Sequence, residues 1–269
     1  MQNASPIRAV GIDVGGTKIA AGVVDVASGA VLERRQVPTR PERGGAAVLE
    51  DCARLTSELG GGALPVGIGL CELVSLDGRP ASAETVDWRS LSLAAAIAAP
   101  RVVLEADVRA AALAEARFGA GRGHSPFLFV ICGTGASSCL VVDGEPYAGA
   151  NGQAITLGAP PVEAIASGLA LARAAGVERA EEVVEDPASA SLVDDAAAAL
   201  AQVLAVLANA LDPAVIVLGG GLGSSEVFRA RVEAAFRPLL TYPVDPPLGL
   251  VGSGLIDGGI VGAALRAAG

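Results

Sequence analysis

The chain has 269 residues, 52% of them apolar and 18% charged, which is enough material for one large domain or two of ordinary size. Twenty-nine acidic and nineteen basic residues give a formal net charge of −10, which argues against a surface that gathers DNA or RNA through their phosphates. No continuous apolar run reaches the roughly 18 to 20 residues of a membrane-spanning helix, and residues 1–8 lack the features of a signal peptide. We therefore expect a cytoplasmic protein with no nucleic-acid and no membrane partner.

The cysteines and the single histidine do not form a recognisable metal motif. Cys52, Cys71, Cys132 and Cys139 are widely spaced in apolar stretches, which favours buried free thiols over disulfides or catalysis. His124 lies in a glycine-rich stretch. The chain scarcely has the ligands of a cysteine and histidine zinc site, so we expect no zinc.

The first part of the chain alternates short apolar runs with glycine turns, and its opening is typical of three antiparallel strands. An alanine-rich helix follows the last of these runs, with Asp107 placed to cap its N-terminus. The elements expected here are strands at 7–14, 18–26, 31–37, 64–74 and 101–106 and helices at 46–59 and 108–118.

Residues 126–149 repeat the strand, glycine turn and strand of the opening, which suggests two halves of similar topology. The later elements expected are helices at 162–174, 192–211, 225–239 and 258–268 and a strand at 214–218. We place an N-terminal lobe at residues 1–105 together with the C-terminal helix 257–269, and a C-terminal lobe at residues 106–256.

The turn after the first strand has the composition of an anion-binding loop. Gly15 and Gly16 let backbone N–H groups approach phosphate oxygens, while Thr17 adds a hydroxyl donor and Lys18, the only lysine, adds a cation. The spacing is not that of a Walker A loop, and a strand rather than a helix follows. An ordinary hairpin turn is the alternative.

Two further glycine clusters favour the phosphate-binding interpretation. One is a second glycine-threonine turn at the matching place of the other half, and two such turns facing each other would hold the β and γ phosphates of ATP. The other ends a strand and opens a helix, where a nucleoside can lie against the backbone. Their residues are Gly133, Thr134 and Gly135 in the first cluster and Gly219, Gly220 and Gly221 in the second.

Two aspartates stand at strand ends. Asp13, beside the first turn, is a candidate Mg²⁺ ligand, directly or through water, and a turn aspartate is its alternative. Asp107, between a strand and a helix, is a candidate general base that accepts the proton of an attacking hydroxyl, and a plain helix cap is its alternative.

Six segments in this order resemble the ROK family (repressors, open reading frames and sugar kinases) of the actin-like ATPase superfold: GIDVGGTK, LEADVRAAALAEARFGAGRG, ICGTG, YAGANG, VEAIASG and DPAVIVLGGG. The resemblance covers nearly the whole chain. It implies an α/β protein with the two-lobed actin-like ATPase (ribonuclease H-like) fold and an active site in the cleft between the lobes. It further implies a sugar kinase that uses ATP and Mg²⁺, with Asp107 as base, and a homodimer.

The resemblance also points to acceptor-binding residues and shows where the chain departs from the family. Ala106 stands where the family has asparagine, Thr156 and Ala159 replace a glutamate and a histidine that contact the sugar, and the family's zinc segment is missing. The polar acceptor contacts that remain or that neighbouring segments supply are Glu84, Asp87, Trp88, Asp107, Asn151, Gly152 and Glu163.

Each missing hydrogen-bond partner costs on the order of 1 to 3 kcal/mol, so we expect glucose to be a poor acceptor. A modified sugar, an aminosugar or a cyclitol fits the altered pocket better. The alternative is a catalytically weak sugar-sensing or regulatory pseudokinase, but the presence of both Asp13 and Asp107 argues against it. Fewer than ten residues precede the first strand, so we do not expect a DNA-binding helix-turn-helix.

Overall fold

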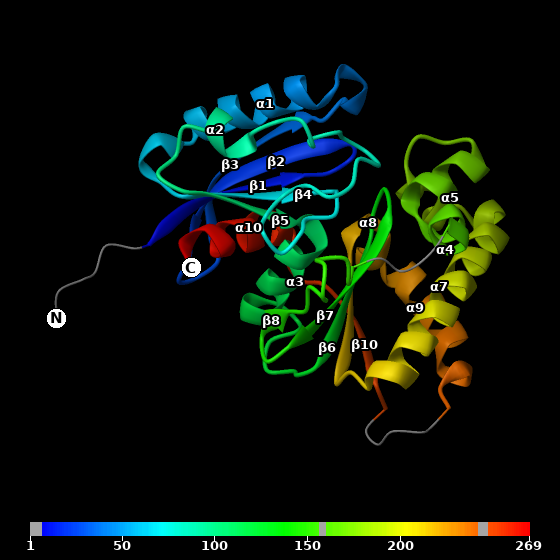
Figure 1. Cartoon of the computed structure of the whole chain (residues 1–269). Coiled ribbons are helices and arrows are strands. Elements are labelled where there is room, and N and C mark those ends of the chain that lie inside the picture. Colours follow the sequence, from blue (N-terminus) through cyan, green and yellow to red (C-terminus); the bar gives the residue numbers. More distant parts are fainter. Residues whose placement is uncertain (1–6, 156–159, 242–246) are drawn as a thin grey trace. The chain divides into compact units, whose positions relative to one another are not determined.

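The computed structural model describes residues 7–155, 160–241 and 247–269, which form two compact α/β units (Figure 1). The first unit comprises residues 7–118, 148–153 and 255–269, and the second comprises the described residues of 119–147 and 154–254. The division differs from the boundary we expected after residue 105. Helix α3 (Asp107–Phe118) belongs to the first unit because it packs against α10 (Gly258–Ala268), the C-terminal helix.

The first unit is built on a five-stranded sheet in the order β3-β2-β1-β4-β5. The opening strands β1, β2 and β3 are antiparallel, as expected, whereas β1, β4 and β5 are parallel. Figure 1 shows α1 along one face of this sheet and α10 with α3 along the other. The bounds are β1 (Arg8–Val14), β2 (Lys18–Asp25), β3 (Ala30–Pro38), α1 (Gly45–Glu58), β4 (Val66–Leu70), α2 (Leu93–Ala96) and β5 (Val102–Ala106).

Helix α10 packs unusually close to the sheet and to α3, and glycine makes this possible. A Cβ atom at Gly11 of β1 or Gly67 of β4 would overlap with the carbonyl groups of Ile260 and Ala263 in α10, respectively. A Cβ atom at Gly262 of α10 would overlap with the carbonyl group of Ala110 in α3. The close packing fixes α10 and α3 against the strands whose ends carry Asp13 and Asp107.

We predict that Gly262→Ala destabilises the protein. Its methyl group has to displace backbone rather than a flexible side chain, and overpacking costs roughly 1–3 kcal/mol, more than the gain of about 1 kcal/mol in helix propensity. Urea unfolding followed by circular dichroism measures the effect. Gly62→Ala is the control, because a Cβ at Gly62 meets nothing within 4 Å. Equal stability of the two variants would contradict the close packing of α10 and α3.

The second unit has a sheet of the same topology. Its order is β10-β9-β6-β7-β8, with β6, β7 and β8 antiparallel and β6, β9 and β10 parallel. Read from β8, this repeats the order of the first sheet strand for strand, so the expected similarity of the two halves is confirmed. The bounds are β6 (Phe127–Cys132), β7 (Ala136–Val142), β8 (Glu145–Pro146), β9 (Val215–Gly219) and β10 (Gly249–Gly252).

The helices of the second unit differ in detail from the expected ones. The single helix expected at 162–174 is two helices, because Ser167 interrupts it and caps the second by accepting a hydrogen bond from the N–H of Ala170. Helix α6 was not expected at all. The bounds are α4 (Pro160–Ala166), α5 (Gly168–Ala175), α6 (Ala180–Glu185), α7 (Ala190–Leu211), α8 (Gly220–Ser224) and α9 (Glu226–Phe236).

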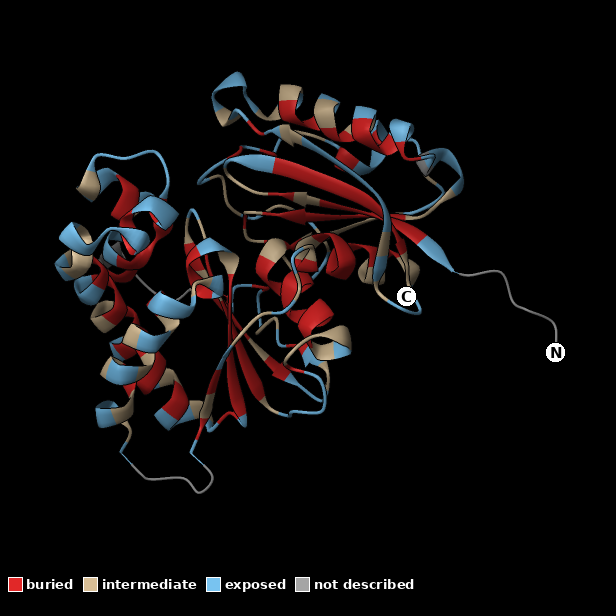
Figure 2. Ribbon diagram, turned by 180° about the vertical axis from the view of Figure 1, so that it is seen from behind, coloured by how far each residue is buried: buried red, intermediate tan, exposed pale blue. Residues whose placement is uncertain are grey.

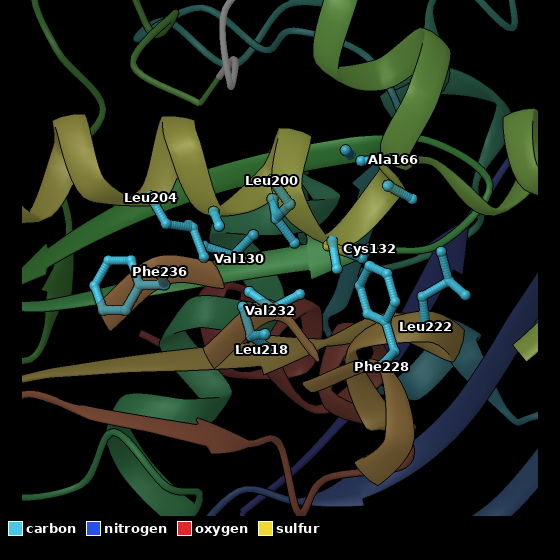
Figure 3. Close-up of a cluster of buried hydrophobic side chains, with 14 of the residues drawn as sticks. Val130, Cys132, Ala166, Leu200, Leu204, Leu218, Leu222, Phe228, Val232 and Phe236 are labelled. Carbon is cyan, nitrogen blue, oxygen red and sulfur yellow. The ribbon is translucent and has the colours of Figure 1, made fainter. Parts of the chain in front are cut away.

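Apolar side chains from α7 and α9 form the core of the second unit together with the sheet. Figure 3 shows Leu200 and Leu204 of α7 near Val130 of β6 and Phe236 of α9, all of them buried. Helix α7 with its preceding turn is long and apolar enough to span a membrane by composition, but this core packing accounts for its apolar face. Figure 2 shows the same concentration of buried residues in the central strands of both sheets.

Candidate functional site

The carboxyl ends of the parallel strands in the first unit bring three acidic residues together. Leu70, the last residue of β4, pairs with Val14 of β1 on one side and with Ala106 of β5 on the other. Asp13 therefore lies at the end of β1, Glu72 just beyond β4, and Asp107 directly after β5. This edge is where open α/β sheets place their ligands.

Asp107 is the first residue of α3, whereas we expected it to be the capping residue just before a helix that begins at Val108. Its Oδ1 accepts a hydrogen bond of 2.6 Å from the N–H of Val108. The pKa of Asp107 is raised to about 7, mainly by burial and also by the negative charges of Asp13 and Glu72, against the lowering effect of that hydrogen bond. The carboxyl group therefore titrates close to neutral pH, as a general base should.

Asp13 is a second carboxyl group with a raised pKa. Burial raises its pKa to about 6, Lys18 and Arg34 lower it, and Asp257 raises it. A methyl group at Gly259, in the first turn of α10, would lie 2.5 Å from Cγ of Asp13, so glycine makes room for the carboxyl group. Arg34 is bound to Asp257, with 2.9 Å between Nε and Oδ1.

Thr39 fixes the turn that contains Gly15, Gly16, Thr17 and Lys18. Its buried hydroxyl donates to the carbonyl of Gly15 at 2.6 Å, and its N–H donates to the carbonyl of Thr17 at 3.0 Å. The N–H of Gly15 donates to the carbonyl of Lys18, and both Thr17 and Lys18 are exposed. The structure thus gives a rigid hairpin turn beside Asp13. No local pattern singles out Thr39, because strands β2 and β3 separate it from the turn in the sequence.

Glu72 shapes the loop that contains the predicted residue Glu84. Its buried carboxylate accepts hydrogen bonds from the N–H groups of Glu84, Thr85 and Val86, at 2.9, 2.6 and 2.9 Å, and from the hydroxyl of Ser82. Four donors satisfy a buried charge that would otherwise be costly. Glu84 itself is exposed. Sequence reasoning missed Glu72, since its partners are ten or more residues away.

Of the two neighbouring predictions of acceptor contacts, Trp88 needs correction, whereas Asp87 stays a prediction. Trp88 is fully buried in the core of the first unit and presents no surface to a ligand. The exposed carboxylate of Asp87 is held by Arg89 through two bonds of 2.9 Å, which lower its pKa to about 2. A tryptophan near two acidic residues in a loop suggested a sugar contact. The ring is instead part of the hydrophobic core of the first unit.

A buried arginine connects the segment containing Asn151 and Gly152 to the first unit. Arg109, two residues after Asp107, donates to the carbonyls of Gly152 and Val74, both at 2.7 Å, and binds Glu105 at 2.6 Å. The loops that follow β4 and β8 are thereby attached to the helix that begins with Asp107. Asn151 is exposed.

In the second unit the two predicted glycine clusters are neighbours. They lie at the carboxyl ends of the parallel strands β6 and β9, where Ile131 pairs with Gly219. Gly220 has a positive φ of 79°, and a Cβ there would overlap with the carbonyl of Cys132, so only glycine fits. The residues of this glycine site are Gly133, Thr134, Gly135, Gly219, Gly220 and Gly221.

Helix α5 donates a hydrogen bond to the backbone of the glycine site, and a carboxylate lies beside the site. The N–H of Gly168, the first residue of α5, donates to the carbonyl of Gly133 at 2.7 Å. The predicted residue Glu163 is exposed on α4, and its Oε1 would lie 2.5 Å from a methyl group at Gly135. Glu163 is thus placed beside the glycine-threonine turn of its own unit.

Thr156 and Ala159, two of the three departures from the family pattern, lie outside the described residues. The third, Ala106, is buried at the end of β5. Within residues 7–155, 160–241 and 247–269, no three histidine, cysteine, aspartate or glutamate side chains form a group suited to a metal ion.

We predict that Asp107→Asn raises the melting temperature at pH 8 by at least about 2 °C, and by much less at pH 4. The folded state holds the Asp107 proton more tightly than the unfolded chain, so this carboxyl group destabilises the protein increasingly as pH rises from about 4 to about 7. Asparagine keeps the acceptor for Val108 but carries no charge. Calorimetry at both pH values measures the difference, with Asp195→Asn, at an exposed aspartate of α7, as control. No gain at pH 8 would contradict the raised pKa.

The chain is similar in sequence to proteins named as sugar kinases. The chain is 28% identical to a glucokinase of Halalkalibacterium halodurans, over 94% of this chain and 92% of the relative. It is 29% identical to an N-acetylgalactosamine kinase of Shewanella sp. (strain ANA-3), over 95% of each.

Solved structures give the same result. A ROK family glucokinase from Streptomyces griseus in complex with glucose and AMPPNP has a TM-score of 0.86 and 27% identity, covering 97% of this chain and 99% of that one. A ROK hexokinase from Thermus thermophilus has a TM-score of 0.74 and 31% identity, covering 97% and 98%. The expected α/β actin-like ATPase fold is confirmed. The model of the ROK family matches residues 9–268, and the chain belongs to this family.

Proposed function

We propose that the chain is an ATP-dependent kinase that phosphorylates a hydroxyl group of a sugar or sugar-like polyol, with Asp107 as the general base. The observation that carries the proposal is the carboxyl group of Asp107 at the end of a parallel strand, with its pKa near 7 and Asp13 beside it. Relatives named as glucokinase and N-acetylgalactosamine kinase support the reaction class. A pseudokinase is not favoured, because the relatives are named kinases and both aspartates are present.

Asp107 is oriented for proton transfer by its own helix. Oδ1 is engaged by the N–H of Val108, while the described residues offer no hydrogen-bond donor to Oδ2. Ionised Oδ2 can therefore accept the proton of an acceptor hydroxyl as its oxygen bonds to phosphorus and the bond from phosphorus to the leaving ADP oxygen breaks. The proton ends on Asp107 and the phosphoryl group on the acceptor.

The residues present fit a nucleotide and Mg²⁺. A Cβ at Gly133 would meet nothing within 4 Å, so there is open space beside the backbone at this position. The next residue, Thr134, is exposed. We assign phosphate binding to Gly133, Thr134 and Gly135 and to Gly15, Gly16, Thr17 and Lys18, and adenosine binding to Gly219, Gly220 and Gly221. Asp13 would hold Mg²⁺ directly or through water, and the metal would neutralise the phosphate charge of ATP, which would supply the phosphoryl group.

The acceptor in this proposal is a modified sugar, an aminosugar or a cyclitol rather than glucose. Ala106 places a buried methyl group where a carboxamide would bond a hydroxyl. Asp107, Glu84, Asn151 and Gly152 of the first unit and Glu163 of the second remain as polar contacts. We further propose that the protein works in the cytoplasm as a homodimer.

The kinase proposal predicts ADP release with a small-molecule acceptor. Purified protein is incubated with ATP, Mg²⁺ and a panel of glucose, N-acetylhexosamines, aminosugars and cyclitols, and a coupled assay detects ADP. We expect Asp107→Asn to lower kcat with the best acceptor by about 10²- to 10⁴-fold with ATP affinity nearly unchanged. We expect glucose to have a lower kcat/KM than the best acceptor.

Asp195→Asn serves as the control, because Asp195 is an exposed residue of α7 in the second unit. Most of the wild-type turnover in Asp107→Asn would sink its assignment as base. Glucose as the best acceptor of the panel would show that Ala106 and the other replacements do not control specificity.

A further inference from the structure

A carboxylate lies on each of the two glycine clusters in the second unit. Glu163 lies against Gly135, as described above. Glu181, in the first turn of α6, lies against Gly221 in the same way: a methyl group at Gly221 would be 2.8 Å from its Oε1. Gly221 follows β9 directly, and α6 packs against α8. Nothing in the sequence pattern had singled out Glu181.

The geometry of Glu181 leaves one oxygen available to a ligand. Oε2 faces Arg179, at 3.5 Å from its Nε, while Oε1 points to the glycine backbone. The side chain is 46% exposed, so a ligand lying on Gly221 can reach it. Arg179 forms an exposed ion pair with this carboxylate, and Oε1 retains the capacity to accept hydrogen bonds.

The charge of Glu181 restricts which part of a nucleotide can lie at Gly221. A carboxylate repels phosphate oxygens at short range, and it offers only acceptors. The nucleotide group beside it must therefore be neutral and must donate hydrogen bonds. Two parts of ATP have this chemistry, the adenine amino group and the ribose with its two adjacent hydroxyl groups. The ribose offers a donor to each side of the carboxylate oxygen, and a carboxylate on a ribose hydroxyl is a common arrangement in nucleotide sites.

We propose that Glu181 is a specificity-determining residue that accepts hydrogen bonds from the ribose hydroxyl groups of the nucleotide bound at Gly219, Gly220 and Gly221. The inference rests on the proposed use of ATP and deepens it. Glycine at position 221 allows the sugar and the carboxylate to meet over bare backbone. The site then selects ribonucleotides over deoxynucleotides, whatever the acceptor of the phosphoryl group.

Direct binding, without turnover, tests this role. Calorimetry is used to titrate ADP, 2′,3′-dideoxyADP and pyrophosphate into the full-length wild type, Glu181→Ala, Glu181→Gln and the control Glu182→Ala, whose exposed side chain is adjacent on the same helix. We expect the wild type and the control to bind ADP at least about 10-fold more tightly than the dideoxy compound, a difference of about 1.4 kcal/mol. We expect Glu181→Ala to bind the two within about 2-fold of each other, with Glu181→Gln intermediate.

Pyrophosphate separates the ribose role from simple charge repulsion. Weaker ADP binding in Glu181→Ala, without weaker pyrophosphate binding, supports the proposal. An unchanged preference for ADP over the dideoxy compound in Glu181→Ala would overturn it while leaving the kinase proposal intact. Failure of the wild type to bind ADP at all would overturn both, and unaltered circular dichroism spectra ensure that a loss of binding is not a loss of fold.

Discussion

Holding the half-buried carboxyl groups of Asp13 and Asp107 partly shielded from water, at the ends of strands β1 and β5, is the constraint on which the candidate site depends. Each group would be more stable in solvent, and the pKa of both is raised because burial penalises their charge. The surrounding backbone is shaped to keep them there. Gly259 makes room for Asp13, and α3 begins at Asp107 and uses one of its oxygens. Such a cost is typical of functional sites, where stability is exchanged for chemistry.

The repeated sheet topology explains why both units carry candidate sites in corresponding places. In each unit a hairpin leads from the central strand, and two parallel strands follow beside it. The carboxyl end of β1 carries the turn from Gly15 to Lys18, and the carboxyl end of β6, its counterpart, carries Gly133, Thr134 and Gly135. The first unit adds aspartates at these ends and the second adds glycines, which suits acid–base chemistry in one and nucleotide binding in the other.

Local features of the fold could be predicted from the sequence, and long-range contacts could not. Strands β1 to β3 and helices α1, α3 and α10 follow from apolar periodicity and glycine stops. Both glycine clusters follow from their composition and their position after strands. Thr39, Glu72 and Arg109 were missed because each acts through partners distant in the sequence. Trp88 was predicted to contact a ligand because its loop has no periodicity that shows whether the ring is buried. One helix was predicted at 162–174, where the structure has two, because a serine is a weak signal for a helix end.

The central claim is that Asp107 acts as a base with a pKa near neutrality, and the pH dependence of kcat/KM with the best acceptor tests it most directly. Because a base must be ionised to accept a proton, and because Asp107 and Asp13 titrate as a pair, we predict that kcat/KM falls about tenfold per pH unit below an apparent pKa near 7. Above it the profile levels off. A kcat/KM that stays constant from pH 5.5 to pH 8 would contradict the assignment.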